Sequence, residues 1–128
     1  MQKNKTKTKK DITKTTAWRR ANSDYGVMVA NDNTSLLGEP AEGQKRINIL
    51  KPIIGNCPEY CPALFDIGQE CIAIGKDKES EKYLDRAFNV MENYHFTKKY
   101  TIKMYKNICS FLKSKFRYEL SAKYYENL

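Results

Sequence analysis

The stretch of sequence that decides the fold is Leu64-Phe65-Asp66-Ile67-Gly68-Gln69-Glu70-Cys71-Ile72-Ala73-Ile74-Gly75. Large apolar residues and one cysteine recur in it at spacings of three and four, which is typical of one buried face of a helix. The positions on this face are Leu64, Ile67, Cys71 and Ile74. Pro62 suits the first turn of the helix, and Gly75 suits a left-handed cap at its end. The stretch therefore predicts a helix from Pro62 that stops at Gly75.

Helical patterns extend outward from this stretch in both directions. They predict helices over residues 15–30, from residue 40 onward, over residues 79–91, from residue 97 onward, and from residue 115 to the end. Residues 31–39 are rich in turn-forming residues and predict a loop. Pro52 should kink or end the helix from residue 40 near Leu50–Lys51. No run alternates between polar and apolar residues, so we expect an all-α chain.

The quoted stretch and the helix after it resemble the tetratricopeptide repeat. The positions of the repeat's first helix are filled by Leu64, Ile67, Gly68, Cys71 and Gly75, and those of its second helix by Ser80, Leu84 and Ala87. A shift of 41 residues aligns Tyr105, Ile108, Cys109 and Leu112 with the first set, and Tyr118, Ser121, Tyr125 and Leu128 with the second-helix pattern. The resemblance implies a short solenoid of about three helix pairs in residues 15–128, with its best repeat at residues 62–91.

The resemblance also implies a binding groove lined by the first helix of each repeat. The groove residues that it implies are Phe65, Gln69, Ile72, Ala73, Lys103, Lys106, Ser110 and Lys113. Because this groove is half apolar and half basic, it suits an extended or helical peptide with an acidic part. We therefore expect a non-catalytic adaptor or scaffold that binds protein partners as a subunit of a larger complex.

The last predicted helix carries an apolar edge. Its inward positions are expected to be Tyr118, Ser121, Tyr125 and Leu128. Phe116, Leu120 and Tyr124 then turn partly outward, and exposed apolar patches usually mark interfaces. We predict that this edge docks against a second copy of the chain or against a larger partner.

Most of the formal charge of +8 at pH 7 comes from the N-terminus. The basic residues there are Lys3, Lys5, Lys7, Lys9, Lys10, Lys14, Arg19 and Arg20, against Asp11 alone. With few apolar residues to bury, residues 1–14 are expected to be disordered, whereas Trp18 is expected to anchor the first helix.

Two interpretations of this basic tail remain open. Clustered lysines release counterions when they bind phosphates. The alternative function is therefore a nucleic-acid-associated accessory protein of a ribonucleoprotein or nuclease complex. The other interpretation is a solubilising leader with no dedicated partner.

Few residues point to catalysis or to a cofactor. His95 is the only histidine, and no phosphate-binding loop or nucleophile-and-base motif is present in the sequence. Cys57 and Cys61 form a pair, but a structural zinc site needs four ligands, and Cys71 and Cys109 are expected to be core thiols. We expect no enzyme, cofactor or metal site.

The 128 residues suit one domain with an ordinary globular composition of 41% hydrophobic and 30% charged residues. The sequence contains neither a membrane-spanning stretch nor a secretory signal. Four cysteines without a secretory signal are typical of reduced thiols. We therefore predict a cytoplasmic protein that does not bind membranes.

Overall fold

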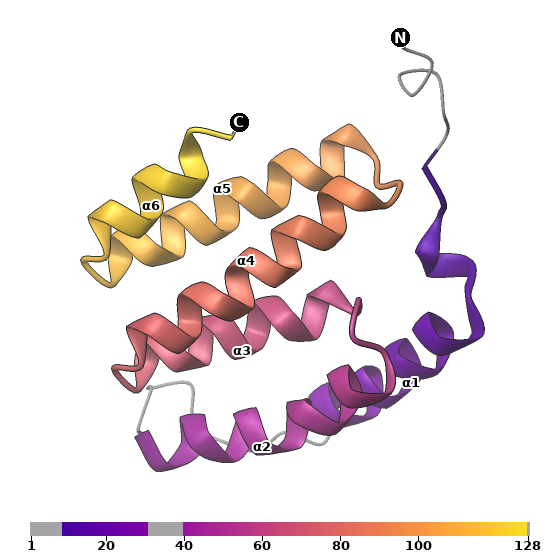
Figure 1. Cartoon of the computed structure of the whole chain (residues 1–128). Helices are drawn as coiled ribbons and strands as arrows, with labels where there is room; N and C mark the ends of the chain where they lie inside the picture. Colours follow the sequence, from indigo (N-terminus) through magenta and orange to yellow (C-terminus); the bar gives the residue numbers. More distant parts are fainter. Residues whose placement is uncertain (1–8, 31–39, 128) are drawn as a thin grey trace, which may run out of the picture.

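Six α-helices follow one another in the computed structural model, which describes residues 9–30 and 40–127. They are α1 (Thr16–Ala30), α2 (Pro40–Asn56), α3 (Cys61–Ala73), α4 (Asp77–Asn93), α5 (Lys98–Ser114) and α6 (Tyr118–Tyr125). Figure 1 shows them stacked in chain order, from α1 and α2 through α3 and α4 to α5 and α6. No strand occurs among the described residues, so the predicted all-α class is confirmed. The predicted loop of residues 31–39 lies outside them.

The α3–α4 pair is built around a close helix crossing at Gly68. A Cβ atom at this position would lie 2.6 Å from Cδ2 of Leu84 on α4, so a side chain here would clash. The Ser80 hydroxyl on α4 donates a hydrogen bond to the Gly68 carbonyl (2.7 Å). After α3, Gly75 has φ +82°, a left-handed conformation that glycine adopts without steric cost. The predicted cap at Gly75 is confirmed.

The α5–α6 pair repeats this geometry 41 positions later in the chain. The Ser121 hydroxyl donates to the Cys109 carbonyl (3.0 Å), as the equivalent serine does in the α3–α4 pair. Phe116 occupies the position of Gly75 and also has a positive φ, +62°. The next backbone N–H donates to the Leu112 carbonyl (2.8 Å). The crossing and the turn therefore recur at the spacing that the sequence alignment predicts.

The left-handed backbone of Phe116 has a consequence for stability. A residue with a side chain loses roughly 1–2 kcal/mol in this conformation, whereas glycine costs roughly 0.4–1 kcal/mol through the entropy of the unfolded chain. Phe116 is 75% exposed, so its ring recovers little by packing. We expect Phe116→Gly to raise the free energy of unfolding by up to about 1 kcal/mol in urea denaturation. A clear loss of stability would contradict this expectation, and Gly75→Phe, the reverse exchange, should destabilise.

α2 runs through Pro52 instead of ending before it. Of the two predicted outcomes near Leu50–Lys51, the end is wrong, because the helix continues to Asn56, and the kink stays a prediction. Pro52 is exposed, and three large apolar side chains around it are buried: Leu50, Ile53 and Ile54. Each buried side chain contributes roughly 1.5–3 kcal/mol, and together they outweigh the roughly 3 kcal/mol that an interior proline costs.

Residues 9–14 pack on the domain. A 3₁₀ turn (Ile12–Lys14) buries Ile12, and the backbone N–H of His95 donates to the Lys10 carbonyl (2.8 Å). The predicted boundary between the disordered tail and the helical domain, at residues 14 and 15, therefore moves toward the N-terminus. The buried side chain of Ile12 packs residues 9–14 on the domain. Residues 1–8 lie outside the described part of the chain, and their disorder stays a prediction.

Aromatic and polar contacts hold α1 against the start of α3. Trp18 is buried, with its ring centroid 4.8 Å from that of Tyr60. The Tyr60 hydroxyl donates to Asn22 Oδ1 (2.7 Å), and the Tyr25 hydroxyl donates to the Asp66 carboxylate. The prediction that Trp18 anchors the first helix is therefore confirmed.

An aromatic cluster joins the α3–α4 pair to the α5–α6 pair. The Phe88 ring of α4 lies 4.9 Å from Phe65 of α3 and stacks on Tyr105 of α5 at 4.0 Å, measured between ring centroids. Tyr124 of α6 packs on the same ring at 4.9 Å. All four rings are buried, so the core of the molecule is continuous across the two helix pairs.

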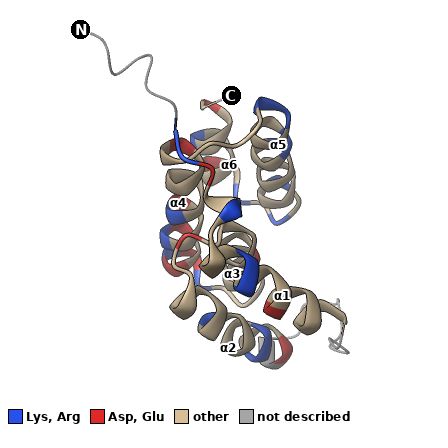
Figure 2. Cartoon of the chain, turned by 90° about the vertical axis from the view of Figure 1, so that its right-hand side faces the viewer, with Lys and Arg blue, Asp and Glu red and all other residues tan. Residues whose placement is uncertain are grey.

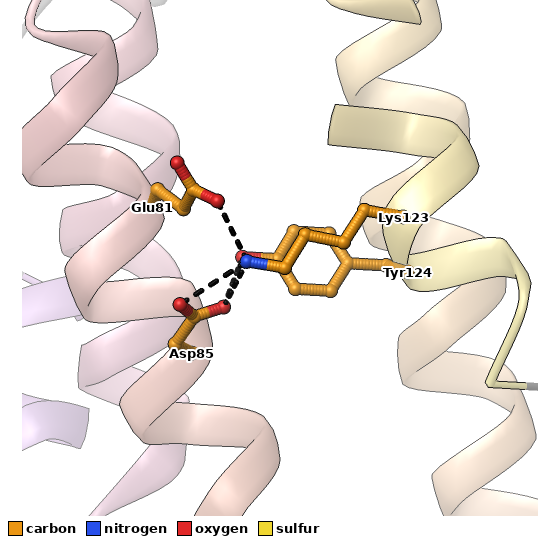
Figure 3. A network of polar contacts seen from close by, with 4 residues as sticks. All are labelled: Glu81, Asp85, Lys123 and Tyr124. Atoms are coloured by element: carbon orange, nitrogen blue, oxygen red, sulfur yellow. Dashed lines mark hydrogen bonds and ion pairs between the residues drawn. The ribbon is translucent and has the colours of Figure 1, made fainter. Parts of the chain in front are cut away.

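A polar network between α4 and α6 lies beside this aromatic cluster (Figure 3). Lys123 Nζ lies 2.6 Å from Glu81 Oε2 and 3.0 Å from Asp85 Oδ1. The Tyr124 hydroxyl donates to Asp85 Oδ1 (2.7 Å). Both α6 side chains point toward α4, so α6 packs on α4 as well as on its own partner α5.

Candidate functional site

Every charged side chain on α5 is positive. The helix starts after Thr97, whose hydroxyl oxygen accepts a hydrogen bond from the Tyr100 backbone N–H (3.2 Å). Its lysines are all exposed: Lys98, Lys99, Lys103, Lys106 and Lys113. Figure 2 shows this basic colouring along α5, whereas α4 carries both signs of charge. The structure thus presents one helix face that favours anions.

Four of these lysines lie along one side of α5, and we call them the lysine stripe (Lys99, Lys103, Lys106 and Lys113). Their spacings of four, three and seven residues return to the same side of a helix with about 3.6 residues per turn. Exposed Ser110 lies on the same line. At about 1.5 Å per residue, the stripe is about 21 Å long. A row of this length can contact several anionic groups of an elongated partner.

The lysine stripe differs from several other cationic side chains in having no ion pair with the part of the chain that the structure describes. Arg46 Nε lies 3.1 Å from Glu70 Oε2, and Arg117 Nε lies 2.6 Å from Asp77 Oδ2. No ion pair within residues 9–30 and 40–127 includes a lysine of α5. Such exposed charges contribute little to stability but attract anions from solution.

The groove residues predicted on α3 separate into two groups. Phe65 and Ile72 are only 2% and 3% exposed, so their prediction as groove-lining residues is wrong. The ring of Phe88 covers Phe65 from α4, which takes the phenyl group into the core. Gln69 and Ala73 are half-buried. The predicted groove therefore keeps its basic half on α5 and loses the large apolar side chains of its other half.

The N-terminal segment adds further cations near the start of α5. Its Lys9 ammonium donates to the Glu92 carbonyl at the end of α4, while Lys10 holds the backbone of His95. The basic residues of the alternative hypothesis that the structure describes are all exposed: Lys9, Lys10, Lys14, Arg19 and Arg20. The remaining ones, Lys3, Lys5 and Lys7, lie outside the described residues. Figure 1 shows this segment at the same end of the molecule as the loop between α4 and α5.

The predicted apolar edge is only partly confirmed. α6 begins at Tyr118 instead of near Lys115, because the left-handed turn at Phe116 separates it from α5. Tyr124 is 2% exposed and packs on Phe88, so its prediction as an edge residue is wrong.

Two tyrosines on the inward side of the last predicted helix are also placed differently from the prediction. Tyr118 and Tyr125 were expected to face inward and are 59% and 62% exposed. Phe116 is exposed and Leu120 half-buried, and both border a hollow of about 650 Å³. Docking of a second copy or a larger partner there stays a prediction.

The four cysteines are buried thiols. Cys71 and Cys109 lie in the core as predicted, and Cys57 and Cys61 are buried as well. Burial raises the pKa of Cys61 to about 12 and that of Cys71 to about 11, so both stay protonated near neutral pH and are poor nucleophiles. Within the described residues, no group of three or more His, Cys, Asp or Glu side chains is placed to hold a metal ion.

None of the helices that the structure describes is long and apolar enough to cross a membrane.

Comparisons with known protein families, with curated proteins and with solved structures found no match. The function of this chain is therefore inferred from its own residues and their arrangement.

Proposed function

We propose that this chain is a non-catalytic helical-repeat module that binds acidic protein segments along the lysine stripe of α5. The observation that carries this proposal is a helix with five exposed lysines, no acidic residue, and no ion pair to the described residues. Such a module acts as an adaptor or scaffold within a larger complex, because it joins proteins without altering them chemically.

The recurrence between the two helix pairs supports a tetratricopeptide-like repeat. Gly68 and Cys109 occupy equivalent crossings, and each carbonyl accepts a hydrogen bond from a serine on the following helix. In repeats of this kind the helix pairs stack, and their first helices form a binding surface. By this register α5 is a first helix, but Lys106 and Lys113 are equivalent to Phe65 and Ile72, which are buried on α3. The exposure and the charge of the lysine stripe therefore support its role as a binding surface, and the register alone does not.

Recognition at this surface is chiefly electrostatic. The buried positions of Phe65 and Ile72 remove the large apolar side chains expected on α3, so charge complementarity supplies specificity and speeds association. Successive residues of an extended segment lie about 3.3 Å apart along its axis. Six or seven residues of such a segment therefore span about 21 Å, the length of the lysine stripe.

Charge reversal in the lysine stripe tests the proposal. We expect Lys103→Glu with Lys106→Glu to weaken binding of an acidic peptide by about tenfold or more, because two attractive contacts become repulsive. Fluorescence anisotropy of a labelled Glu/Asp-rich peptide measures this affinity. Thermal melting should change little, since both lysines are exposed.

The matched control reverses two lysines on another helix. Lys45 and Lys51 are exposed on α2, and their change to Glu alters the net charge of the chain equally. If this control weakens peptide binding as much as the stripe variant, binding depends on overall charge, and the lysine stripe is not the site.

One observation favours a nucleic-acid partner as a second candidate. The N-terminal segment and α1 carry five exposed basic residues: Lys9, Lys10, Lys14, Arg19 and Arg20. Of these, Lys9 and Lys10 contact the end of α4 and the loop before α5. Phosphate binding would weaken steeply with salt, because each neutralised phosphate releases counterions. Arg19→Glu with Arg20→Glu reverses two of these exposed charges and leaves the buried Ile12 unchanged. If that variant greatly weakens oligonucleotide binding and leaves peptide binding intact, these basic residues have this second role.

A further inference from the structure

A hollow lined by aromatic rings lies where the N-terminal segment meets the start of α5. Its volume is about 410 Å³, and we call it the aromatic hollow. It is lined by Asp11, Thr13, Trp18, His95, Phe96, Thr97 and Tyr100. Three different parts of the chain therefore form its walls: the N-terminal segment with α1, the α4–α5 loop, and the first turn of α5.

The walls of the hollow are fixed by contacts within the protein. The Phe96 and Tyr100 rings stack with centroids 5.7 Å apart, and Trp18 lies 6.0 Å from Phe96. The hydrogen bond from the His95 backbone to Lys10 holds the N-terminal wall in place. A hollow with such walls exists before a ligand arrives, which lowers the entropic cost of binding.

The hollow adjoins the lysine stripe through α5. Tyr100 follows Lys99 directly, and Lys103 and Lys106 lie three and six residues further on. At about 1.5 Å per residue these lysines are about 4.5 and 9 Å along the helix axis from Tyr100. An extended segment that starts in the hollow would therefore present side chains to both lysines within about three residues.

We propose that the aromatic hollow receives an apolar side chain of the same acidic segment that binds the lysine stripe. The preferred ligand is then an apolar anchor residue followed along the chain, in one direction or the other, by acidic residues. This inference rests on the proposed function and adds the apolar half of the recognition, which is absent at Phe65 and Ile72.

The packing of the rings favours an apolar side chain over a nucleotide base. The three rings pack on one another rather than standing apart to hold a base between them. The Asp11 carboxylate also lines the hollow, and the hydrogen bond from the Thr13 side chain lowers its pKa, so it is negatively charged near neutral pH. The acidic residues of the ligand must therefore lie outside the hollow, along the lysine stripe, with the uncharged anchor alone inside it.

Trp18 gives the experiment a direct probe, because it is the only tryptophan in the chain. The ligands are acidic peptides of about eight residues, with leucine at the N-terminal end, leucine at the C-terminal end, or glycine at both. We expect one leucine peptide to bind about tenfold tighter than the glycine peptide, since burying a leucine side chain contributes at least that factor. We expect only this tighter-binding leucine peptide to change the fluorescence emission of Trp18.

Two variants and a control test whether the higher affinity of the leucine peptide arises in the aromatic hollow. Phe96→Ala removes a wall, and His95→Phe fills space from an exposed position, so each should bring the leucine peptide close to the affinity of the glycine peptide. Thermal melting shows which variants stay folded. Tyr125→Ala removes an exposed ring on α6 and should leave the gain unchanged.

The outcomes separate this inference from the proposed function. If the glycine peptide binds but neither leucine peptide gains affinity or changes Trp18 emission, the aromatic hollow is not an anchor site, and the lysine stripe remains one. If no acidic peptide binds, both proposals are wrong. If a single-stranded oligonucleotide changes Trp18 emission and displaces the leucine peptide at lower concentration, the hollow is a nucleotide site instead.

Discussion

Gly68→Leu should unfold the chain or lower its melting temperature more than any exposed substitution. A Cβ atom at residue 68 would already lie 2.6 Å from Leu84 Cδ2 and 2.8 Å from Leu84 Cγ, and leucine adds three more carbon atoms. Overpacking of a core costs typically 1–3 kcal/mol and at times more, against a total stability of roughly 5–15 kcal/mol for a small domain. The substitution should also break the hydrogen bond from Ser80 to the carbonyl of residue 68, because α3 and α4 must move apart to make room for the leucine.

Alanine substitutions provide the matched comparison. Gly68→Ala places a single carbon in the same crowded space and should destabilise. Gly26 lies within α1, and a Cβ atom added there would have no neighbouring atom within 4 Å, so Gly26→Ala should stabilise by roughly 0.5–1 kcal/mol through helix propensity. Thermal melting followed by circular dichroism measures both. If Gly68→Leu melts like the wild type, α3 and α4 do not cross at this residue.

Phe88→Ala is expected to have the second large effect. Its ring contacts one aromatic ring on each of three other helices: Phe65 on α3, Tyr105 on α5 and Tyr124 on α6. Truncation of a buried phenylalanine costs about 3–5 kcal/mol. Because this side chain joins the two helix pairs, we expect a large fall in the urea midpoint and loss of cooperativity between α3–α4 and α5–α6.

The control for Phe88→Ala is Tyr118→Ala, which removes an aromatic ring that is 59% exposed. It should change the free energy of unfolding by no more than about 0.5 kcal/mol. Hydrogen exchange then shows which helices lose protection. If Phe88→Ala costs as little as Tyr118→Ala, the aromatic cluster does not couple the two pairs.

Local signals were sufficient to predict the central helices. The helix that contains Leu64, Ile67 and Cys71 is indicated by the spacing of these residues, and its left-handed cap is indicated by Gly75. Both signals are local in the sequence. The 41-residue alignment also contained a signal that sequence reasoning missed. It places Phe116 on Gly75 and thus indicates the turn that delays the start of α6.

The errors arose where distant parts of the chain decide the outcome. Phe65 is buried by Phe88, and the family register alone does not show which ring will cover a groove position. Tyr124 and Tyr125 are adjacent, so a small change in where α6 begins exchanges the buried ring for the exposed one. α2 continues through Pro52 because the burial around it exceeds a local penalty.

The candidate site was predictable in its charge but not in its shape. Lys103, Lys106 and Lys113 were predicted from the repeat register and are exposed. The aromatic hollow brings Trp18 together with Phe96 and Tyr100, which are about 80 positions later in the chain. Only the packing of residues 9–14 against the α4–α5 loop creates it.

Nuclear magnetic resonance mapping of an acidic peptide on the intact chain tests the central claim most directly. The isotopically labelled protein is titrated with an unlabelled Glu/Asp-rich peptide, and backbone amide shifts are followed residue by residue. Binding at the lysine stripe predicts shifts that saturate together and cluster between Lys98 and Ser114, with α2 and the outer face of α4 unchanged. Saturating shifts confined to other helices, or no shifts at millimolar peptide, would contradict it.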